Sequence, residues 1–522
     1  MFIWFCVLIS FCNITRMKKI NLCASLLFLL LQSTGFAQSH QTTKPNVVFI
    51  LADDLGYGEV GCFGQTKIKT PNIDALAKEG MRFTQFYAGA PVCAPSRCGF
   101  LTGMHSGHAY VRNNFGTAGY KENVNENGNY PLDSSAYTIG NLFKDDDYAT
   151  AAIGKWGLGN YDNSGNPLIH GFDLFYGYYD QRHAHNYYTT HLYNNATHDT
   201  LNNPVINVHP KFDSASKASR DPKDYTGNEY SIDKMTAQAI SFIDKNHAQP
   251  FFLYLPYTLP HAVLQAPQSY IDQYIKYLNE QPNWSVTNNG IPTYYPLSTY
   301  AAQVSYLDTQ VKIILDELHR YDLDSNTIVI FTSDNGASDG ERLRSAFFNS
   351  CAGLRGFKSD LYEGGIREPF VIKWPDHIPP NTVNTNPAIL YDMMATFADI
   401  LKVKAPKNDG VSMLPMITAS TGKYKQHKYF YWEFPGKGRQ VAVRMGNWKG
   451  VRTGLLQNPN APWQVYDIVA DSAETHDVAA QYPELIRKFK KIVRKAHTTP
   501  VKKEWDIYSP ADPNTKQPKE AD

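Results

Sequence analysis

The sequence predicts an α/β fold with a large mixed, mainly parallel central sheet and helices on both faces. Three observations support this. Short apolar runs rich in β-branched residues recur through residues 46–332, as is typical of strands buried on both faces of a sheet. Segments with helical spacing of apolar residues lie between these runs. Strands and helices that alternate in this way build βαβ units, in which helices cover both faces of the sheet.

Length and charge narrow the class of protein. The 522 residues suffice for one large domain, or for a large domain and a small one. A composition with 43% hydrophobic and 19% charged residues is ordinary for a folded globular protein. The net charge of +1 gives no reason to expect a nucleic acid or an anionic membrane as partner.

The first 37 residues are predicted to be a targeting leader. A basic start at Met17–Lys19 precedes an apolar run at 20–31, and Gly35-Phe36-Ala37 offers the small residues of a cleavage site. Translation is expected to begin at Met17, since that start alone gives an ordinary leader. Each apolar run is shorter than the ~20 residues that a membrane-spanning helix needs. We therefore expect a secreted or periplasmic protein without a membrane span.

Residues 38–415 are predicted to form the larger domain. Its expected strands are apolar runs that end in polar or glycine-rich residues. They span Asn46–Ala52, Tyr148–Ile153, Phe251–Leu255 and Thr327–Thr332. Helices are expected at 70–80, with Thr70 as N-cap, and at 303–321. The polar segment 194–228 is expected to be a long loop.

Residues 416–522 are predicted to form a smaller α+β subdomain. Short runs separated by turn residues indicate an antiparallel sheet, with strands at 429–434, 440–445 and 448–453. The spacing of apolar residues over 483–497 predicts an amphipathic helix.

Acidic and amide side chains follow two of the expected strands. Asp53 and Asp54 come directly after one strand, and Asp334 and Asn335 follow another. A bare Asp-Asp pair is more often a helix cap with a solvated neighbour. Here four oxygen-bearing side chains at strand ends suit Ca²⁺ or Mg²⁺. Two unit charges ~4 Å apart repel by about 4 kcal/mol at an effective dielectric near 20, so converging carboxylates need a cation.

Cys93 and Arg97 stand where a helix is expected to begin. The ordinary interpretation is a buried thiol at a helix N-terminus, and with Cys62, Cys98 and Cys351 one disulfide is possible. A helix N-terminus also suits an anion. Arg97 lies one helical turn after Cys93, so its guanidinium can reach back towards it.

Three basic residues follow strands or glycine-rich turns, the places where sites are commonly built. They are Lys155, His261 and Lys358. Taken singly, each lysine would more often be solvated and the histidine structural.

Several strings together resemble the type I, formylglycine-dependent sulfatases, an arylsulfatase-like family of the alkaline phosphatase superfamily. The string C-x-P-S-R-x-x-L-x-T-G covers Cys93–Gly103. The segments 45–56, 332–336 and 354–369 are also family-like and occur in the family's order. The resemblance extends roughly from Asn46 to Asp467 and implies an alkaline-phosphatase-like fold.

The resemblance implies a reaction and its residues. Cys93 would be oxidised by a maturase to formylglycine (3-oxoalanine) and hydrated to a gem-diol, and one hydroxyl would attack sulfur. His261 would protonate the leaving oxygen, and Arg97 would hold the diol. Lys155 and Lys358 would bind sulfate oxygens. The implied Ca²⁺ ligands are Asp53, Asp54, Asp334 and Asn335, with the modified Cys93 also facing the ion.

One position departs from the family pattern. Many members have a histidine two residues after the lysine, whereas this chain has Gly157. The segment 181–191 is rich in histidines; it is either an aromatic loop packed on the core or a supplier of His183 or His185 to the pocket. Arg112 is a weaker candidate for substrate contact, and Glu433 is weaker still.

The expected function is hydrolysis of a sulfuric monoester, on a sulfated carbohydrate. Two alternatives stay open. One is a phosphodiesterase or phosphonate monoester hydrolase of the same superfold, which the complete string at 93–103 disfavours. The other is a non-catalytic carbohydrate-binding relic, which would be favoured if Cys93 were never modified.

Overall fold

The computed structural model describes residues 44–114, 128–212, 216–286, 290–338, 342–418 and 425–509. The described residues from Pro45 onward belong to one compact unit. The expected leader at 1–37 lies outside the described residues. No helix within the described ranges combines the length and apolarity that crossing a membrane requires.

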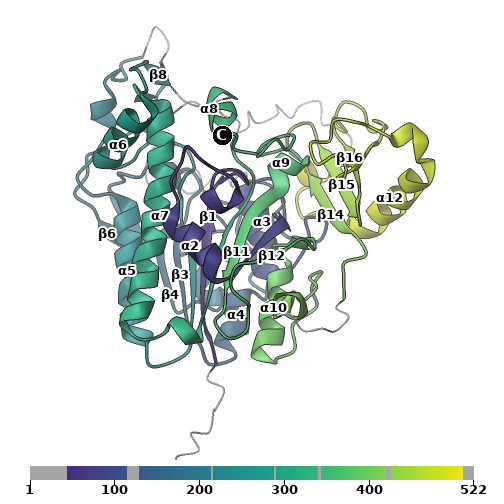
Figure 1. Cartoon of the computed structure of the whole chain (residues 1–522), viewed down its shortest axis with the longest axis horizontal. Coiled ribbons are helices and arrows are strands. Elements are labelled where there is room, and N and C mark those ends of the chain that lie inside the picture. The colour runs from purple at the N-terminus through teal and green to yellow at the C-terminus, as the bar shows by residue number, and fades with distance from the viewer. Residues whose placement is uncertain are drawn as a thin grey trace, which may run out of the picture. The chain divides into compact units, whose positions relative to one another are not determined.

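A mixed sheet forms the centre of this unit (Figure 1). In the described part of the chain it has eleven strands. Its order is β12 (Thr382–Asn384), β2 (Met81–Tyr87), β11 (Arg367–Lys373), β10 (Thr327–Ser333), β1 (Asn46–Ala52), β7 (Phe251–Pro256), β3 (Ala149–Lys155), β4 (Leu174–Tyr178), β5 (His191–Asn194) and β6 (Thr197–Thr200), with β13 (Ala388–Ile389) paired to β2.

The middle of the sheet is parallel. β1 pairs with β10 on one side and β7 on the other, and β7 continues through β3 to β4. Antiparallel pairing appears at β11 and again at β5 and β6. The four strands expected from the sequence are all present, and they are consecutive neighbours in this parallel block.

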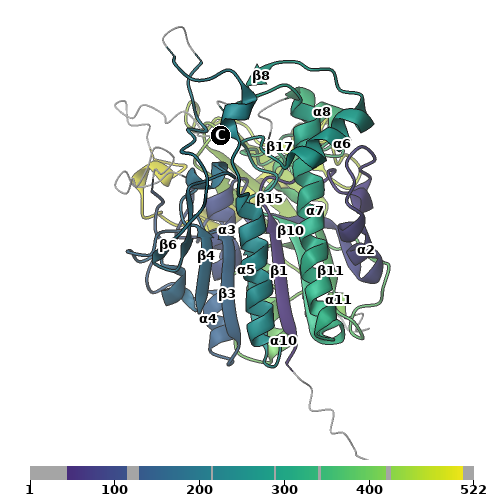
Figure 2. The same ribbon diagram turned by 90° about the vertical axis from the view of Figure 1, so that its left-hand side faces the viewer.

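Each face of the sheet is covered by helices (Figures 1 and 2). Alternate residues of β1 divide between two cores, with Val48 and Ile50 in one and Val47, Phe49 and Leu51 in the other. The first core contains residues of α2 (Pro71–Glu79), α5 (Ser231–Asn246) and α7 (Pro296–Arg320). The second contains residues of α3 (Cys93–Thr102), α4 (Ile139–Lys144) and α10 (Asp392–Leu401). The predicted fold class is confirmed in this respect.

The C-terminal part builds a second sheet. It is antiparallel in the order β14 (Phe430–Phe434), β15 (Gln440–Met445), β16 (Trp448–Arg452) and β17 (Gln464–Asp467). The amphipathic helix α12 (Pro483–Ala496) packs Leu485, Phe489 and Val493 against β15 and β17 residues. Shorter elements are α6 (Gln268–Leu278), α8 (Arg342–Phe348), α9 (Glu363–Ile366), α11 (Leu414–Ile417), β8 (Ser285–Val286) and β9 (Pro292–Thr293).

Some local expectations were wrong. Thr70 is the N-cap residue of α2, as predicted, but its hydroxyl accepts a hydrogen bond from the Gly61 N–H at 2.8 Å and none from the N–H groups of the helix. The helix expected at 303–321 begins seven residues earlier, at Pro296, a residue well suited to a first helical turn. The segment 194–228 is not all loop, since β6 pairs with β5 within it. The four cysteines of the described chain are free thiols.

Buried ion pairs join the two sheets. Lys449 of β16, itself fully buried, contacts Glu363 at 2.9 Å and Glu474 at 3.0 Å. Gln440 of β15 accepts a hydrogen bond from the Leu361 N–H and donates one to the Ser359 carbonyl. The C-terminal sheet therefore holds the chain segment that precedes β11.

The Lys449 cluster predicts a pH dependence of stability. Burial raises the pKa of Glu363, but Lys449 and nearby arginines outweigh it and lower that pKa to about 2. Burial, followed by the charge of Glu363, raises the pKa of Glu474 to about 7. The stabilisation that Glu363 adds to the free energy of unfolding is thus lost as pH falls from about 4.5 to 2. The stabilisation that protonated Glu474 adds is lost as pH rises from about 4.5 to 7.

We therefore expect Glu474→Gln to reduce the change of unfolding free energy with pH between pH 5 and pH 7. Between pH 5 and pH 7 the wild type should lose more unfolding free energy than the variant, measured by urea denaturation. The exposed Glu504→Gln is the matched control and should follow the wild type. Equal pH dependence of all three proteins would contradict the assignment.

Candidate active site

Four neighbouring strands bring the predicted site residues to one edge of the sheet. Asp334 and Asn335 follow β10, and Asp53 and Asp54 follow β1. Lys155 ends β3, and His261 lies five residues after β7, which separates β3 from β1. Because these parallel strands end at the same edge, residues 280 positions apart in the chain come into contact, as in the hydrogen bond from the Asp54 N–H to Asp334.

Cys93 faces the acidic pair. Its Sγ atom is 3.2 Å from Oδ1 of Asp53 and 3.9 Å from Oδ1 of Asp54. Helix α3 begins at Cys93, as predicted. The Ala94 N–H, which has no partner within the helix, donates a hydrogen bond to Oδ1 of Asn114 at 2.8 Å. Asp54 has φ +62°, a left-handed conformation that is uncommon outside glycine and occurs preferentially at functional positions.

Three positively charged side chains surround these carboxylates; Arg97 and Lys155 are buried and Lys358 is partly buried. Arg97 contacts Asp334 at 2.8 Å and Asp53 at 3.3 Å, and it also donates to the Lys155 carbonyl at 2.5 Å. Nζ of Lys155 lies 2.6 Å from Asp53. Nζ of Lys358, from the loop before α9, lies 2.9 Å from Asp54.

His261 belongs to the same cluster. Its Nε2 is 3.0 Å from Nζ of Lys358 and 3.3 Å from Asp54. Its Nδ1 is 2.9 Å from the Ala262 carbonyl, which can only accept, so Nδ1 carries a proton. Burial, and then the charge of Lys358, lowers the pKa of His261 to about 4. Nε2 therefore accepts a hydrogen bond from the Lys358 ammonium.

The carboxylates respond differently to this environment. Burial favours the neutral form of Asp53, but Lys155, His261 and Arg97 outweigh it and hold the pKa of Asp53 far below its usual range. Burial and the charge of Asp53 raise the pKa of Asp334 to about 7. Burial, followed by Asp53, raises the pKa of the Cys93 thiol well above its usual value. An unmodified thiol here would be a weak nucleophile, because the thiolate is the reactive form.

The donor set fits a hard divalent cation. Ligand atoms of Asp53, Asp54, Cys93 and His261 all lie within 4.8 Å of one another. Oδ1 of Asn335 is buried and has no hydrogen-bond partner in the described chain, while its Nδ2 donates to Asp54 at 2.7 Å. A free amide oxygen beside several carboxylates is a typical ligand arrangement for Ca²⁺.

Of the two candidate histidines, the structure brings His185 to the cluster. Its ring stacks on that of His261 with centroids 4.6 Å apart, and its Nδ1 is 2.9 Å from Nε2 of His209. The contacts of His183 are with Thr189 and the rings of Tyr178 and His191. His209, which the sequence analysis did not single out, lies in the polar segment 194–228, where no motif marks it.

Comparison with known proteins identifies the family. The sequence model of the sulfatase family matches residues 45–403, and that of the "N-sulphoglucosamine sulphohydrolase, C-terminal" region matches residues 357–499. The chain belongs to the sulfatase family. This family is part of the alkaline phosphatase superfamily, and the protein is a sulfuric ester hydrolase.

Individual relatives agree with this assignment. The sulfatase is 28% identical over 548 residues to N-acetylgalactosamine-6-O-sulfatase of Bacteroides thetaiotaomicron, covering 93% of this chain and 99% of the relative. It is 28% identical over 443 residues to N-acetylgalactosamine-6-sulfatase of Mus musculus, covering 82% and 75%. The solved structure of Ps i-CgsB in complex with k-i-k-neocarrahexaose superimposes with a TM-score of 0.70 at 27% identity, covering 88% and 94%.

Arg112 of the sulfatase contacts the C-terminal part of the chain. Its guanidinium lies 2.6 Å from Glu433 of β14 and also bonds Thr498 and the Gly107 carbonyl. Glu433 in turn contacts His497 at 2.8 Å. These contacts tie the segment after α3 to the C-terminal part, and the substrate contact suggested for Arg112 stays a prediction.

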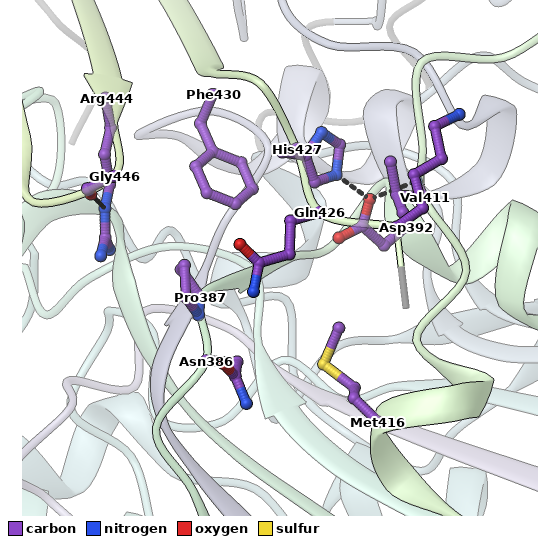
Figure 3. Close-up of a pocket in the computed structure, with 11 residues that line it drawn as sticks. Asn386, Pro387, Asp392, Val411, Met416, Gln426, His427, Phe430, Arg444 and Gly446 are labelled. Atoms are coloured by element: carbon purple, nitrogen blue, oxygen red, sulfur yellow. Dashed lines mark hydrogen bonds and ion pairs between the residues drawn. The ribbon is translucent and has the colours of Figure 1, made fainter. Parts of the chain in front are cut away.

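A small cavity lies between α10 and β14, and Figure 3 shows it. Its volume is about 50 Å³, and Asp392, Met416, His427 and Phe430 are among its lining residues. Asp392 contacts His427 at 2.6 Å and accepts hydrogen bonds from the Ile389 and Val411 N–H groups. The cavity is too small for a sugar ring. Its carboxylate, Asp392, already accepts the hydrogen bonds that connect these segments.

His185 provides a test of the predicted pocket. We expect His185→Ala to lower kcat/KM about tenfold, because the His261 ring loses the surface that orients it. The exposed His319→Ala is the matched control and should retain wild-type kinetics. If His183→Ala and His185→Ala both kept full kcat and KM, neither histidine would belong to the pocket.

Proposed function

We propose that this sulfatase hydrolyses sulfuric monoesters of sulfated carbohydrates outside the cytoplasm, as a secreted or periplasmic enzyme. The activities in the names of the relatives, and the sugar bound to the solved neighbour, support a carbohydrate substrate. The observation that carries the catalytic part is the contact of Cys93 with Asp53 and Asp54, within a cluster that also contains three positively charged side chains. N-acetylgalactosamine 6-sulfate is the first compound to test.

The side chains of the cluster have complementary charges. Asp53, Asp54 and Asp334 carry three negative charges when ionised, and Arg97, Lys155 and Lys358 carry three positive ones. Ca²⁺, held by Asp53, Asp54, Asp334 and Asn335 with residue 93 facing it, would supply two further positive charges next to the anionic ester. Formylglycine, made from Cys93 by a maturase, would supply the hydrated aldehyde as nucleophile.

The remaining residues bind the sulfo group and manage protons. Lys155 and Lys358 would hold sulfate oxygens and stabilise the charge that develops on them. Arg97, fixed by Asp334 and the Lys155 carbonyl, would keep residue 93 in place. The proton for the leaving oxygen would come from the hydrogen-bonded pair of Lys358 Nζ and His261 Nε2. Lys358 would pass a proton to His261 Nε2, and His261 would then donate it to the leaving oxygen as the general acid.

The test combines a substrate panel with a mass measurement. Protein made in a host that matures sulfatases is assayed on sulfated mono- and disaccharides, an aryl sulfate, a phosphodiester and a phosphonate monoester. The peptide containing residue 93 should be about 18 Da lighter than its cysteine form. Sulfate release from a sugar, together with the lighter peptide, is the expected result.

Two other outcomes would replace the proposal. Faster turnover of the phosphodiester or phosphonate than of every sulfate ester would make the protein a phosphoryl or phosphonyl hydrolase of the same fold. Binding of sulfated sugars without turnover, with an unmodified Cys93, would make it a carbohydrate-binding relic.

A further inference from the structure

Gly157 stands where many members of the family have a histidine, and the structure shows what fills the space. A Cβ atom built on Gly157 would lie 2.4 Å from Nε2 and 3.0 Å from Cδ of Gln181. Gly157 also has φ +73°, a conformation that favours glycine. The Gln181 amide therefore lies where a side chain at position 157 would begin, and the two residues depend on each other.

Position 157 lies just beyond the end of the strand that carries Lys155. Side chains alternate along β3, so that Ile153 lies in one core and Ala152 in the other. Lys155 continues the first series and contacts Asp53, whereas Trp156 is buried in the second core. Gly157 lies two residues beyond Lys155, past the end of β3, so the space beside it adjoins the strand end that carries this lysine.

Gln181 also shares a segment with a residue that reaches the cluster. Its backbone N–H is held by Asn129, and Asp180 fixes the turn by accepting the N–H groups of Arg182 and His183. Four residues after Gln181, His185 stacks on His261. One turn after β4 thus reaches both Gly157 and His261.

The Gln181 amide has an unused donor. Its Nε2 atom is buried and, in the described chain, has no hydrogen-bond partner. Leaving a buried amide donor unpaired is unfavourable, and such groups are commonly satisfied by a ligand when they lie in a site. The sulfo group offers only acceptors, which matches this donor.

We propose that Gln181 replaces the family histidine as a neutral hydrogen-bond donor to the sulfo group of the substrate. This inference rests on the proposed sulfatase function and adds a binding residue to it. An amide keeps its donor at every pH of interest, whereas an imidazole in this place would titrate. Gln181 would act together with Lys155, which holds the sulfo group from the neighbouring strand end.

The test uses variants that keep the shape of the side chain. Gln181→Met removes the donor, and Gln181→Glu places a negative charge beside the anion. The exposed Gln268→Met on α6, whose amide bonds Asp272, is the matched control. The readouts are kcat/KM on an aryl sulfate and the inhibition constant of inorganic sulfate, which reports binding without turnover.

We expect Gln181→Met to weaken sulfate inhibition and lower kcat/KM, each about tenfold, as for loss of one hydrogen bond to a charged group. Gln181→Glu should lose about a hundredfold or more because of charge repulsion. Wild-type values in Gln181→Met, with the wild type active, would overturn the inference. If that variant fails to fold, Gln181→Asn, which withdraws the amide by one methylene, is judged by the same criteria.

Failure of the proposed function would be distinct. If the wild type hydrolysed no sulfate ester, calorimetric titration of wild type and Gln181→Met with inorganic sulfate would decide the role of Gln181. Tighter binding by the wild type would support the inference even then, and equal binding would overturn it.

Discussion

Cys93→Ala is expected to lower sulfate release by about ten-thousand-fold or more, since removal of a nucleophile typically has effects of this size. The Cys93 side chain points at Asp53 and Asp54, and no other cysteine of the described chain contacts these acids. The residual rate would reflect binding and charge stabilisation by Lys155 and Lys358 alone. The measurement is inorganic sulfate released by purified protein from a host able to mature the wild type.

Cys98→Ala is the matched control for this variant. Cys98 lies on the same helix and is equally buried, but its side chain belongs to the hydrophobic core rather than to the acidic cluster. Its loss should reduce stability modestly, by about 1 kcal/mol for a small core truncation, and leave kcat within a few-fold. Undiminished turnover by Cys93→Ala would exclude residue 93 as the nucleophile.

Under the proposed function, removal of Ca²⁺ is expected to have the second largest effect. Without the cation, buried carboxylates face an anionic ester with only three compensating side chains, and repulsion between charges ~4 Å apart amounts to about 4 kcal/mol at an effective dielectric near 20. We expect a chelator to lower kcat/KM at least a hundredfold, and added Ca²⁺ to restore it. The melting temperature should fall as well, because a ligand bound only by the folded state stabilises it.

Asp54→Ala should reproduce the chelated state without a chelator. Asp54 contacts Asn335, Lys358 and His261, so its loss removes a ligand and releases two cationic or proton-carrying partners. The exposed Asp316→Asn on α7 should behave like the wild type, with full response to Ca²⁺. Full activity of chelated wild type, with the metal content verified as zero, would contradict a role for the ion.

The sequence was sufficient to predict that these residues come together, because each of them stands in a local pattern. Asp53, Asp54, Asp334 and Asn335 each stand directly after an apolar run, and parallel strand ends meet by geometry. Cys93 and Arg97 belong to a single string. The structure confirms the fold class that these patterns predict, and it places all of these residues in one contact network.

The remainder depends on contacts between distant segments. The strands β2 and β11 pair in an antiparallel manner, and no local sequence pattern indicates a partner nearly 300 residues away. His209 is placed by its contact with His185, which lies in the segment after β4. The Gln181 amide occupies space that is available because Gly157 has no side chain. The sequence alone shows that position 157 has no side chain, but it does not show which residue occupies the space.

The attachment of the C-terminal sheet to the loop that carries Lys358 limits how far the enzyme can be shortened. Ser359, Leu361 and Glu363 all contact residues beyond 439. These contacts support the loop that places Lys358 against Asp54, in addition to the hydrogen bond from the Lys358 N–H to the Ala337 carbonyl. The two family matches overlap over this same stretch, at 357–403. A truncated protein ending near residue 415 would retain Asp53, Asp54, Asp334 and Asn335, yet we expect it to be a poor catalyst, because the loop that carries Lys358 would lose its contacts with the C-terminal sheet.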